Sequence, residues 1–186
     1  MLRYTLMRTV LNPLLAIASE GGLMRLEFLP RGYKYHTHAS GFARRTANGD
    51  GDGPEELVED PSAFADLRAQ LAEYFVGQRE TFDVPLDLRG TPFQLRVWRR
   101  LIRIPYGKLK TYKEIARSIR SPSATRAVGQ AAGNNPVPIL VPCHRLVGTK
   151  RTLVGFAGGL SVKAQLLRLE GHTLGGTQRI EAAQLF

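Results

Sequence analysis

A change of pattern near residue 90 divides this chain of 186 residues into two unlike halves. Short apolar runs separated by turn residues fill the first half, whereas signals for helix starts recur through the second. The charge changes at the same place. Residues 1–90 hold 10 basic and 13 acidic side chains, and residues 91–186 hold 16 basic and 3 acidic ones. A chain of this length forms one ordinary domain or two small ones, and the coincident changes predict two.

The first half is typical of a small sheet with one helix packed on it. Three strands are predicted from apolar runs bounded by turn residues, over 4–9, 14–18 and 23–29. The run 81–88 is a candidate for another strand. Asp60 followed by Pro61 predicts the start of a helix that reaches Gly77. Its apolar face is formed by Phe64, Leu67, Leu71 and Phe75. Nothing in this half indicates chemistry.

The second half opens with two helix-start signatures. Thr91 with Gln94, and Thr111 with Glu114, have the spacing of capping boxes, in which side chain and backbone satisfy each other's hydrogen bonds. A third helix is predicted over 123–132. Two short helices joined by a tight break are typical of a helix-turn-helix, and the alternative is an ordinary helical hairpin.

The excess of positive charge in this half favours a polyanionic partner, with nucleic acid ahead of a membrane surface. The third helix offers Arg126 and Gln130 among small residues, whereas reading bases in the major groove needs several long polar side chains. Small residues permit close approach to the walls of a groove, which predicts weak sequence preference. The alternative is a helix packed tightly in the core.

A single cysteine, Cys143, excludes an intramolecular disulfide and any zinc site built from several thiolates. The pair His36 and His38 is the one metal-like spacing of histidines, and an exposed loop explains it better, so we expect no metal. No apolar run reaches the roughly 18 residues of a membrane span. We therefore expect an unprocessed cytoplasmic protein.

The segment around Cys143 is the candidate for chemistry. Pro136, Pro138 and Pro142 precede the cysteine and stiffen the backbone, so the thiol is held in place. A lone cysteine is usually an inert buried side chain. Here His144 and Arg145 follow it directly, and such neighbours lower the pKa of a thiol and make it a better nucleophile. Together with a DNA-binding half, a reactive cysteine predicts an electrophile in DNA as substrate.

The residues 135–145, Asn-Pro-Val-Pro-Ile-Leu-Val-Pro-Cys-His-Arg, resemble the active-site signature of the O6-alkylguanine-DNA alkyltransferases, also called methylated-DNA–protein-cysteine methyltransferases. The resemblance covers roughly residues 91–172. It includes the segments 93–98, 104–107, 111–116, 126–129, 155–159 and 169–172. The first half is similar only in outline to that family's α/β domain of ribonuclease-H-like topology. The family implies an α+β protein of two small domains, over 1–88 and 91–175, with a tail over 176–186. The second domain is then of the winged-helix or helix-turn-helix kind.

The resemblance implies a role for each catalytic residue. Cys143 is expected to take the alkyl group from O6 of guanine, with His144 as a general base through a water and Glu170 orienting His144. Tyr112 matches the tyrosine that rotates the nucleotide phosphate and gives a proton to the departing guanine. Asn135 matches the asparagine that ties the recognition helix to the active-site turn. No cofactor is implied.

The implied partner is double-stranded DNA bound through its minor groove by a monomer. Guanine O6 lies inside the base stack, so attack on its alkyl carbon needs the nucleotide flipped into a pocket. Arg126 matches the arginine that fills the space left by the extruded base; otherwise it is a phosphate contact. The remaining DNA-facing residues of this helix are expected to be Thr125, Ala127, Gly129 and Gln130.

The pocket for base and alkyl group is expected to be lined by Val141, Val147, Gly155, Phe156 and Ala157. Two of these depart from the family, because Phe156 replaces a frequent tyrosine and Ala157 a common serine. One hydrogen-bond donor to the guanine is therefore missing, which puts the tolerated size of the alkyl group in question.

Two other classes of function compete with this interpretation. A cysteine hydrolase would need an oxyanion hole and a distant histidine, and it leaves the basic half unexplained. A non-catalytic DNA-binding regulator, or a lesion sensor of the alkyltransferase-like kind, would not need a nucleophile. Cys143 argues against the sensor.

Overall fold

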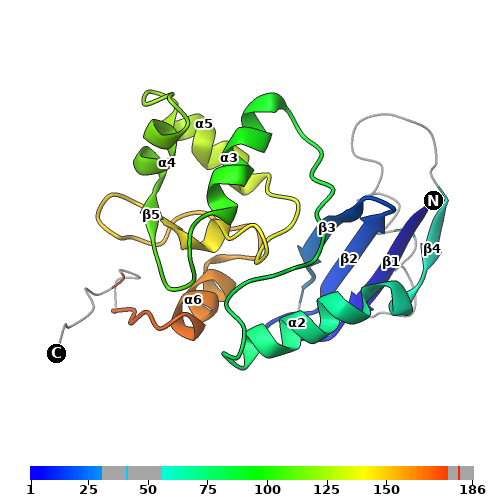
Figure 1. Cartoon of the computed structure of the whole chain (residues 1–186). Helices are drawn as coiled ribbons and strands as arrows, with labels where there is room; N and C mark the ends of the chain where they lie inside the picture. The colour runs from blue at the N-terminus through cyan, green and yellow to red at the C-terminus, as the bar shows by residue number, and fades with distance from the viewer. Residues whose placement is uncertain (31–40, 42–55, 176–179, 181–186) are drawn as a thin grey trace. The chain divides into compact units, whose positions relative to one another are not determined.

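The computed structural model describes residues 1–30, 41, 56–175 and 180 (Figure 1). The chain separates into two compact units, Met1–Arg89 and Gly90–Phe186. The pair His36 and His38 lies outside the described residues, as does the predicted tail apart from Ile180.

The first unit contains a four-stranded sheet in the order β3-β2-β1-β4. Its strands are β1 (Leu2–Met7), β2 (Leu14–Ser19), β3 (Gly22–Phe28) and β4 (Leu57–Glu59). Strands β1, β2 and β3 pair antiparallel, and β4 pairs parallel to β1. The three strands predicted from sequence are confirmed. The expected strand over 81–88 is wrong, because that run forms only an isolated bridge between Leu86 and Leu23.

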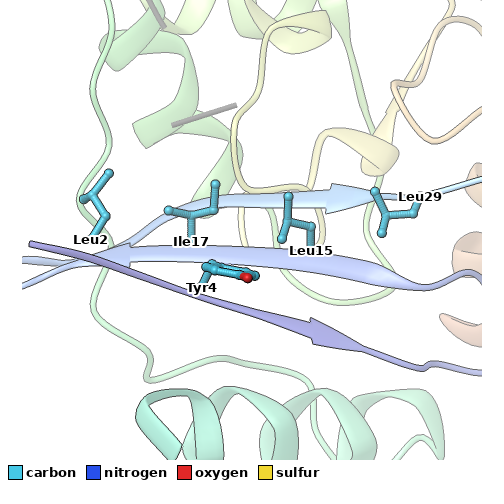
Figure 2. Packing of buried hydrophobic residues seen from close by; sticks show 5 residues of the cluster. All are labelled: Leu2, Tyr4, Leu15, Ile17 and Leu29. Carbon is cyan, nitrogen blue, oxygen red and sulfur yellow. The ribbon is translucent and has the colours of Figure 1, made fainter. Parts of the chain in front are cut away.

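One face of this sheet buries an apolar cluster. Figure 2 shows four of its residues on the neighbouring strands β1 and β2, and Leu29 follows directly after β3. The two residues from each strand lie on one face because alternate residues of a strand point to the same side. The cluster consists of Leu2, Tyr4, Leu15, Ile17 and Leu29, each at most 5% exposed.

The predicted helix begins as a 3₁₀ turn, η1 (Pro61–Phe64), and continues as α2 (Ala65–Phe75). The Asp60 side chain accepts hydrogen bonds from the backbone of Ser62 and Ala63, as the sequence predicted. Three of the four predicted apolar residues are buried. The fourth is Tyr74 and not Phe75, because a helix period of 3.6 places Tyr74 on the same face and its ring fills the core.

The second unit is mainly helical. Its helices are α3 (Pro92–Ile102), α4 (Tyr112–Ser118), α5 (Thr125–Gly133) and α6 (Leu160–Leu169), with a 3₁₀ turn η2 (Cys143–Arg145). The short strands β5 (Lys110–Thr111) and β6 (Leu146–Val147) pair parallel. Both predicted capping boxes are present. The buried Trp98 indole donates to the Ala131 carbonyl at 2.8 Å and so fixes α3 against α5. Within the described ranges, no helix is long and apolar enough to cross a membrane.

Candidate active site

The cysteine is delivered by a tight turn between α5 and η2. The Val141 amide donates to the Val137 carbonyl at 2.9 Å, which closes the turn. Between them Ile139 is buried and has a φ of 78°, a left-handed conformation that β-branched residues rarely adopt. Such strain costs about 1–3 kcal/mol and persists only where surrounding contacts impose it.

Asn135 supplies several of those contacts. Its side-chain amide donates to the Val141 carbonyl at 2.7 Å and to Cys143 Sγ at 3.0 Å, and its Oδ1 accepts from the Val137 amide at 3.0 Å. One buried side chain therefore fixes both the turn and the sulfur. The link from the end of α5 to the cysteine, implied by the family resemblance, is present in the structure.

His144 and Glu170 form a buried pair. His144 Nε2 lies 2.8 Å from Glu170 Oε1, and both side chains are fully buried. Among the described residues, buried His144 Nδ1 has no hydrogen-bond partner. Burial lowers the pKa of His144, although its bond with Glu170 opposes that shift. Burial alone would raise the pKa of Glu170, but the hydrogen bonds and charges of His144 and Arg145 hold it well below its usual range. Glu170 is therefore ionised, His144 Nε2 donates to it, and Nδ1 keeps its lone pair.

The thiol is less acidic than its sequence neighbours predicted. Burial raises the pKa of Cys143, and the groups that oppose this shift are Asn135 and Lys163. The expectation that adjacent His144 and Arg145 lower this pKa is wrong. In the 3₁₀ turn consecutive side chains point in different directions, and Arg145 binds Glu170. A base is therefore needed to take the thiol proton.

Lys163 is a residue of this site that the sequence analysis missed. It is fully buried, and its ammonium donates to the carbonyls of Leu146 at 2.6 Å and Val154 at 2.7 Å. Burial lowers its pKa to about 8. The lysine thus joins β6 to the segment that contains Gly155. A lone lysine in an amphipathic helix gives no sequence signal for such a position.

Tyr112 begins α4, and its hydroxyl donates to the Val154 carbonyl at 3.2 Å. The pKa of Tyr112 is raised to about 12, mainly by burial and to a smaller extent by the nearby Cys143, so the phenol keeps its proton. Tyr112 also adjoins α5. A Cβ built on Gly129 would lie 3.8 Å from the Tyr112 ring, which is ordinary van der Waals contact.

Helix α5 has one buried and one exposed face. Val128, Ala131 and Ala132 are buried, so the alternative of a core-packed helix describes this face alone. Arg126 and Gln130 are exposed, and the other predicted DNA-facing residues are half-buried: Thr125, Ala127 and Gly129. The small residues permit close packing, and two long polar side chains project from the outer face.

The predicted pocket residues differ in exposure. Val141 and Val147 are buried, Phe156 is half-buried, and Gly155 and Ala157 are exposed. The Phe156 ring stands edge-on to the His144 imidazole, with 6.5 Å between the ring centres.

Comparison with known proteins identifies the family. Residues 92–172 match the DNA-binding domain of 6-O-methylguanine DNA methyltransferase, and residues 2–88 match its ribonuclease-like domain. A methylated-DNA–protein-cysteine methyltransferase of Methanosarcina barkeri is 39% identical over 171 residues, which are 92% of this chain and 98% of the relative. One from Mycobacterium bovis is 53% identical over 111 residues, 60% of this chain and 67% of the relative.

Solved structures support the same family assignment. The crystal structure of the Mycobacterium tuberculosis O6-methylguanine methyltransferase superposes with a TM-score of 0.75 and 40% identity, covering 91% of this chain and 93% of that one. A complex of the M. tuberculosis protein with DNA gives a TM-score of 0.74 and 40% identity, covering 90% of this chain and 92% of that one. This chain belongs to the 6-O-methylguanine DNA methyltransferase family.

Proposed function

We propose that this protein repairs DNA by moving an alkyl group, methyl foremost, from O6 of guanine to its own Cys143. The observation that carries the proposal is the buried thiol held by Asn135, next in sequence to His144. His144 pairs with Glu170 through Nε2, and its Nδ1 has no hydrogen-bond partner among the described residues. Family membership supplies the substrate class, because the relatives are named methylated-DNA–protein-cysteine methyltransferases.

The step begins with a proton transfer. The Cys143 thiol gives its proton through a water to Nδ1 of His144, while Glu170 stabilises the imidazolium that forms. The sulfur attacks the alkyl carbon, so that an S–C bond forms as the C–O6 bond breaks. Tyr112 suits the role of hydrogen-bond donor to the departing guanine, because its pKa of about 12 keeps the hydroxyl protonated. The guanine anion then takes up the proton that His144 accepted from the thiol.

The product is a thioether, which has no carbonyl for water to attack, so each molecule reacts once and irreversibly. This distinguishes the proposal from a cysteine hydrolase, whose acyl-thioester would turn over. We assign the pocket for the base and alkyl group to residues around Cys143 and His144, with Phe156 edge-on to the imidazole. Those residues are Val141, Val147, Gly155, Phe156 and Ala157.

The partner in this proposal is double-stranded DNA, bound in its minor groove by a protein monomer in the cytoplasm. The exposed face of α5 supports a close approach to the groove, because small residues surround Arg126 and Gln130. Arg126 would occupy the stack when the nucleotide turns out, and the M. tuberculosis relative is described in complex with DNA.

The direct test is to incubate the protein with a duplex that contains one O6-methylguanine and to follow both products. We expect restored guanine in the DNA and one added methyl group on the peptide that contains Cys143, measured by mass spectrometry. Restored guanine with an unmodified Cys143 would overturn the proposal. A lesion bound without any transfer would favour a sensor or regulator.

Arg126→Ala is expected to slow repair of a duplex lesion by about 10- to 100-fold, because flipping a base costs a few kcal/mol that a wedge offsets. Reaction with a free O6-alkylguanine base should change little, since no extrusion is needed. Single-turnover rates on the two substrates measure this difference. Equal losses on both would show that Arg126 does not act as the wedge.

The rate of transfer should hold as the pH falls through 6.5. Burial keeps the pKa of His144 below its ordinary value of 6.5, so the imidazole stays neutral and able to accept a proton in this range. At lower pH the imidazole becomes protonated and the rate should drop. The pH profile with a free O6-alkylguanine base tests this, and a rate that already declines above pH 6.5 would contradict the assignment.

A further inference from the structure

We propose that Arg145 is a positioning residue for the transfer. It fixes the Glu170 carboxylate in the orientation that holds the ring proton of His144 on Nε2 and leaves Nδ1 unprotonated. This inference rests on the proposed function, because it gives Arg145 a role in activating Cys143.

Arg145 holds Glu170 with a fork of hydrogen bonds. Its Nε lies 2.9 Å from Oε2 and 3.2 Å from Oε1, and a terminal nitrogen donates to Oε1 at 2.9 Å. The Gly107 amide adds a donor to Oε2 at 3.1 Å. Gly107 has a φ of 66°, and a Cβ there would lie 3.2 Å from the Glu170 carbonyl oxygen, so glycine suits this approach. The carboxylate plane is thereby fixed.

The guanidinium is itself fixed. Arg145 is 5% exposed, its other terminal nitrogen donates to the Ile104 carbonyl, and its charge lies 5.9 Å from the centre of the Tyr106 ring. The Tyr106 hydroxyl in turn donates to the Leu169 carbonyl at 2.7 Å, beside Glu170. Arginine suits this position because its planar fork binds both oxygens of a carboxylate at once.

The fixed carboxylate determines which ring nitrogen of His144 carries the proton. With Oε2 occupied by Gly107 and Arg145, Glu170 turns Oε1 to His144 Nε2 at 2.8 Å. An ionised carboxylate only accepts, so the ring proton must lie on Nε2 and Nδ1 must carry the lone pair. Without Arg145 the buried carboxylate can rotate away from His144 Nε2, and the histidine loses its defined tautomer.

Other charges act on the same pair. Glu170 favours the imidazolium form of His144, whereas Arg145 and Lys163 disfavour it. His172 also faces Glu170 and lies in the field of Arg151 and Lys108. Burial is the largest influence that disfavours the imidazolium, and removing the charge of Arg145 leaves burial and Lys163 to oppose Glu170. His144 would then be protonated at a higher pH than in the unchanged protein.

The test compares Arg145→Met and Arg145→Lys with the control Arg168→Met. Arg168 is exposed in the last turn of α6, two residues before Glu170, so the control removes the same charge outside the pair. Three quantities are measured on the full chain: the rate of transfer from a free O6-alkylguanine base against pH, the ¹⁵N shifts of the His144 ring, and the melting temperature. The His144 signals are assigned by their loss in His144→Gln.

We expect Arg145→Met to slow transfer by about 10- to 100-fold, within the contribution of a general base. We also expect the acid limb of its pH profile to move to higher pH. Arg145→Lys should keep the limb near its original place with an intermediate rate, because the charge remains but the fork is lost. The Nδ1 shift should be that of an unprotonated nitrogen in the unchanged protein and Arg168→Met, and of a mixture in Arg145→Met.

A folded Arg145→Met with an unchanged pH profile and an unchanged Nδ1 shift would overturn the inference, whatever its rate. If Arg145→Met does not fold, Arg145→Lys decides, and a lysine variant with the full rate and the original ring shifts would equally overturn it. If the unchanged protein itself transfers no alkyl group to Cys143, the proposed function fails. The ring shifts would still report how Arg145 acts on His144.

Discussion

Cys143→Ser is expected to abolish alkyl transfer, with a loss on the order of 10⁴-fold or more, as for removal of other catalytic nucleophiles. A serine hydroxyl is a far weaker nucleophile than a thiol at neutral pH. The replacement is otherwise mild, because serine is of similar size and its oxygen still accepts a hydrogen bond from Asn135.

Binding to a duplex with one O6-methylguanine should survive in this variant, since the exposed face of α5 is unchanged. Cys143→Ser therefore separates recognition from chemistry, and a binding assay beside the transfer assay provides the control. Transfer that persists in Cys143→Ser would refute the assignment of the nucleophile.

Glu170→Gln is expected to destabilise the protein by about 3–5 kcal/mol, the cost of breaking a buried ion pair by removing one partner. The change leaves the charge of Arg145 buried without its counter-charge and replaces one of the two accepting oxygens by an NH2 group that only donates. Because folding lowers the pKa of Glu170 from its ordinary value of 4.5, its stabilisation is present above about pH 4.5. That stabilisation is lost as the pH falls toward the lower pKa of the folded state.

Urea unfolding at neutral pH and below pH 4.5 measures both effects. At neutral pH the free energy of unfolding of Glu170→Gln should be much lower than that of the unchanged protein. Below pH 4.5 the difference between the two free energies should become smaller. Glu114→Gln is a matched control, because Glu114 is exposed and glutamine also completes a capping box. A Glu170→Gln variant as stable as Glu114→Gln would contradict this description of the pair.

Local signals in the sequence predicted most elements of the fold. The capping boxes at Thr91 and Thr111 depend on residues three positions apart, so the chain contains all the information that each helix start needs. Asp60 acts in the same way. Which of Tyr74 and Phe75 is buried could not be predicted, because either residue continues the apolar face of the helix. Packing in the folded protein buries Tyr74.

The site itself depends on contacts that no local signal contains. Glu170 meets His144 across 26 residues, and only the family resemblance suggested that pair. Lys163 reaches the Leu146 carbonyl from α6, and a single lysine in a helix predicts nothing of the kind. The neighbours of Cys143 misled, because burial raises the pKa of the thiol and Arg145 binds Glu170.

In the proposed function, one cysteine accepts one alkyl group and keeps it. The most direct measurement mixes the protein with an excess of duplex containing O6-methylguanine and counts methyl groups by mass spectrometry after the reaction ends. We expect one methyl group per protein molecule, located on Cys143, and an equal amount of restored guanine. More guanine restored than protein present, or a methyl group at any other residue, would contradict it.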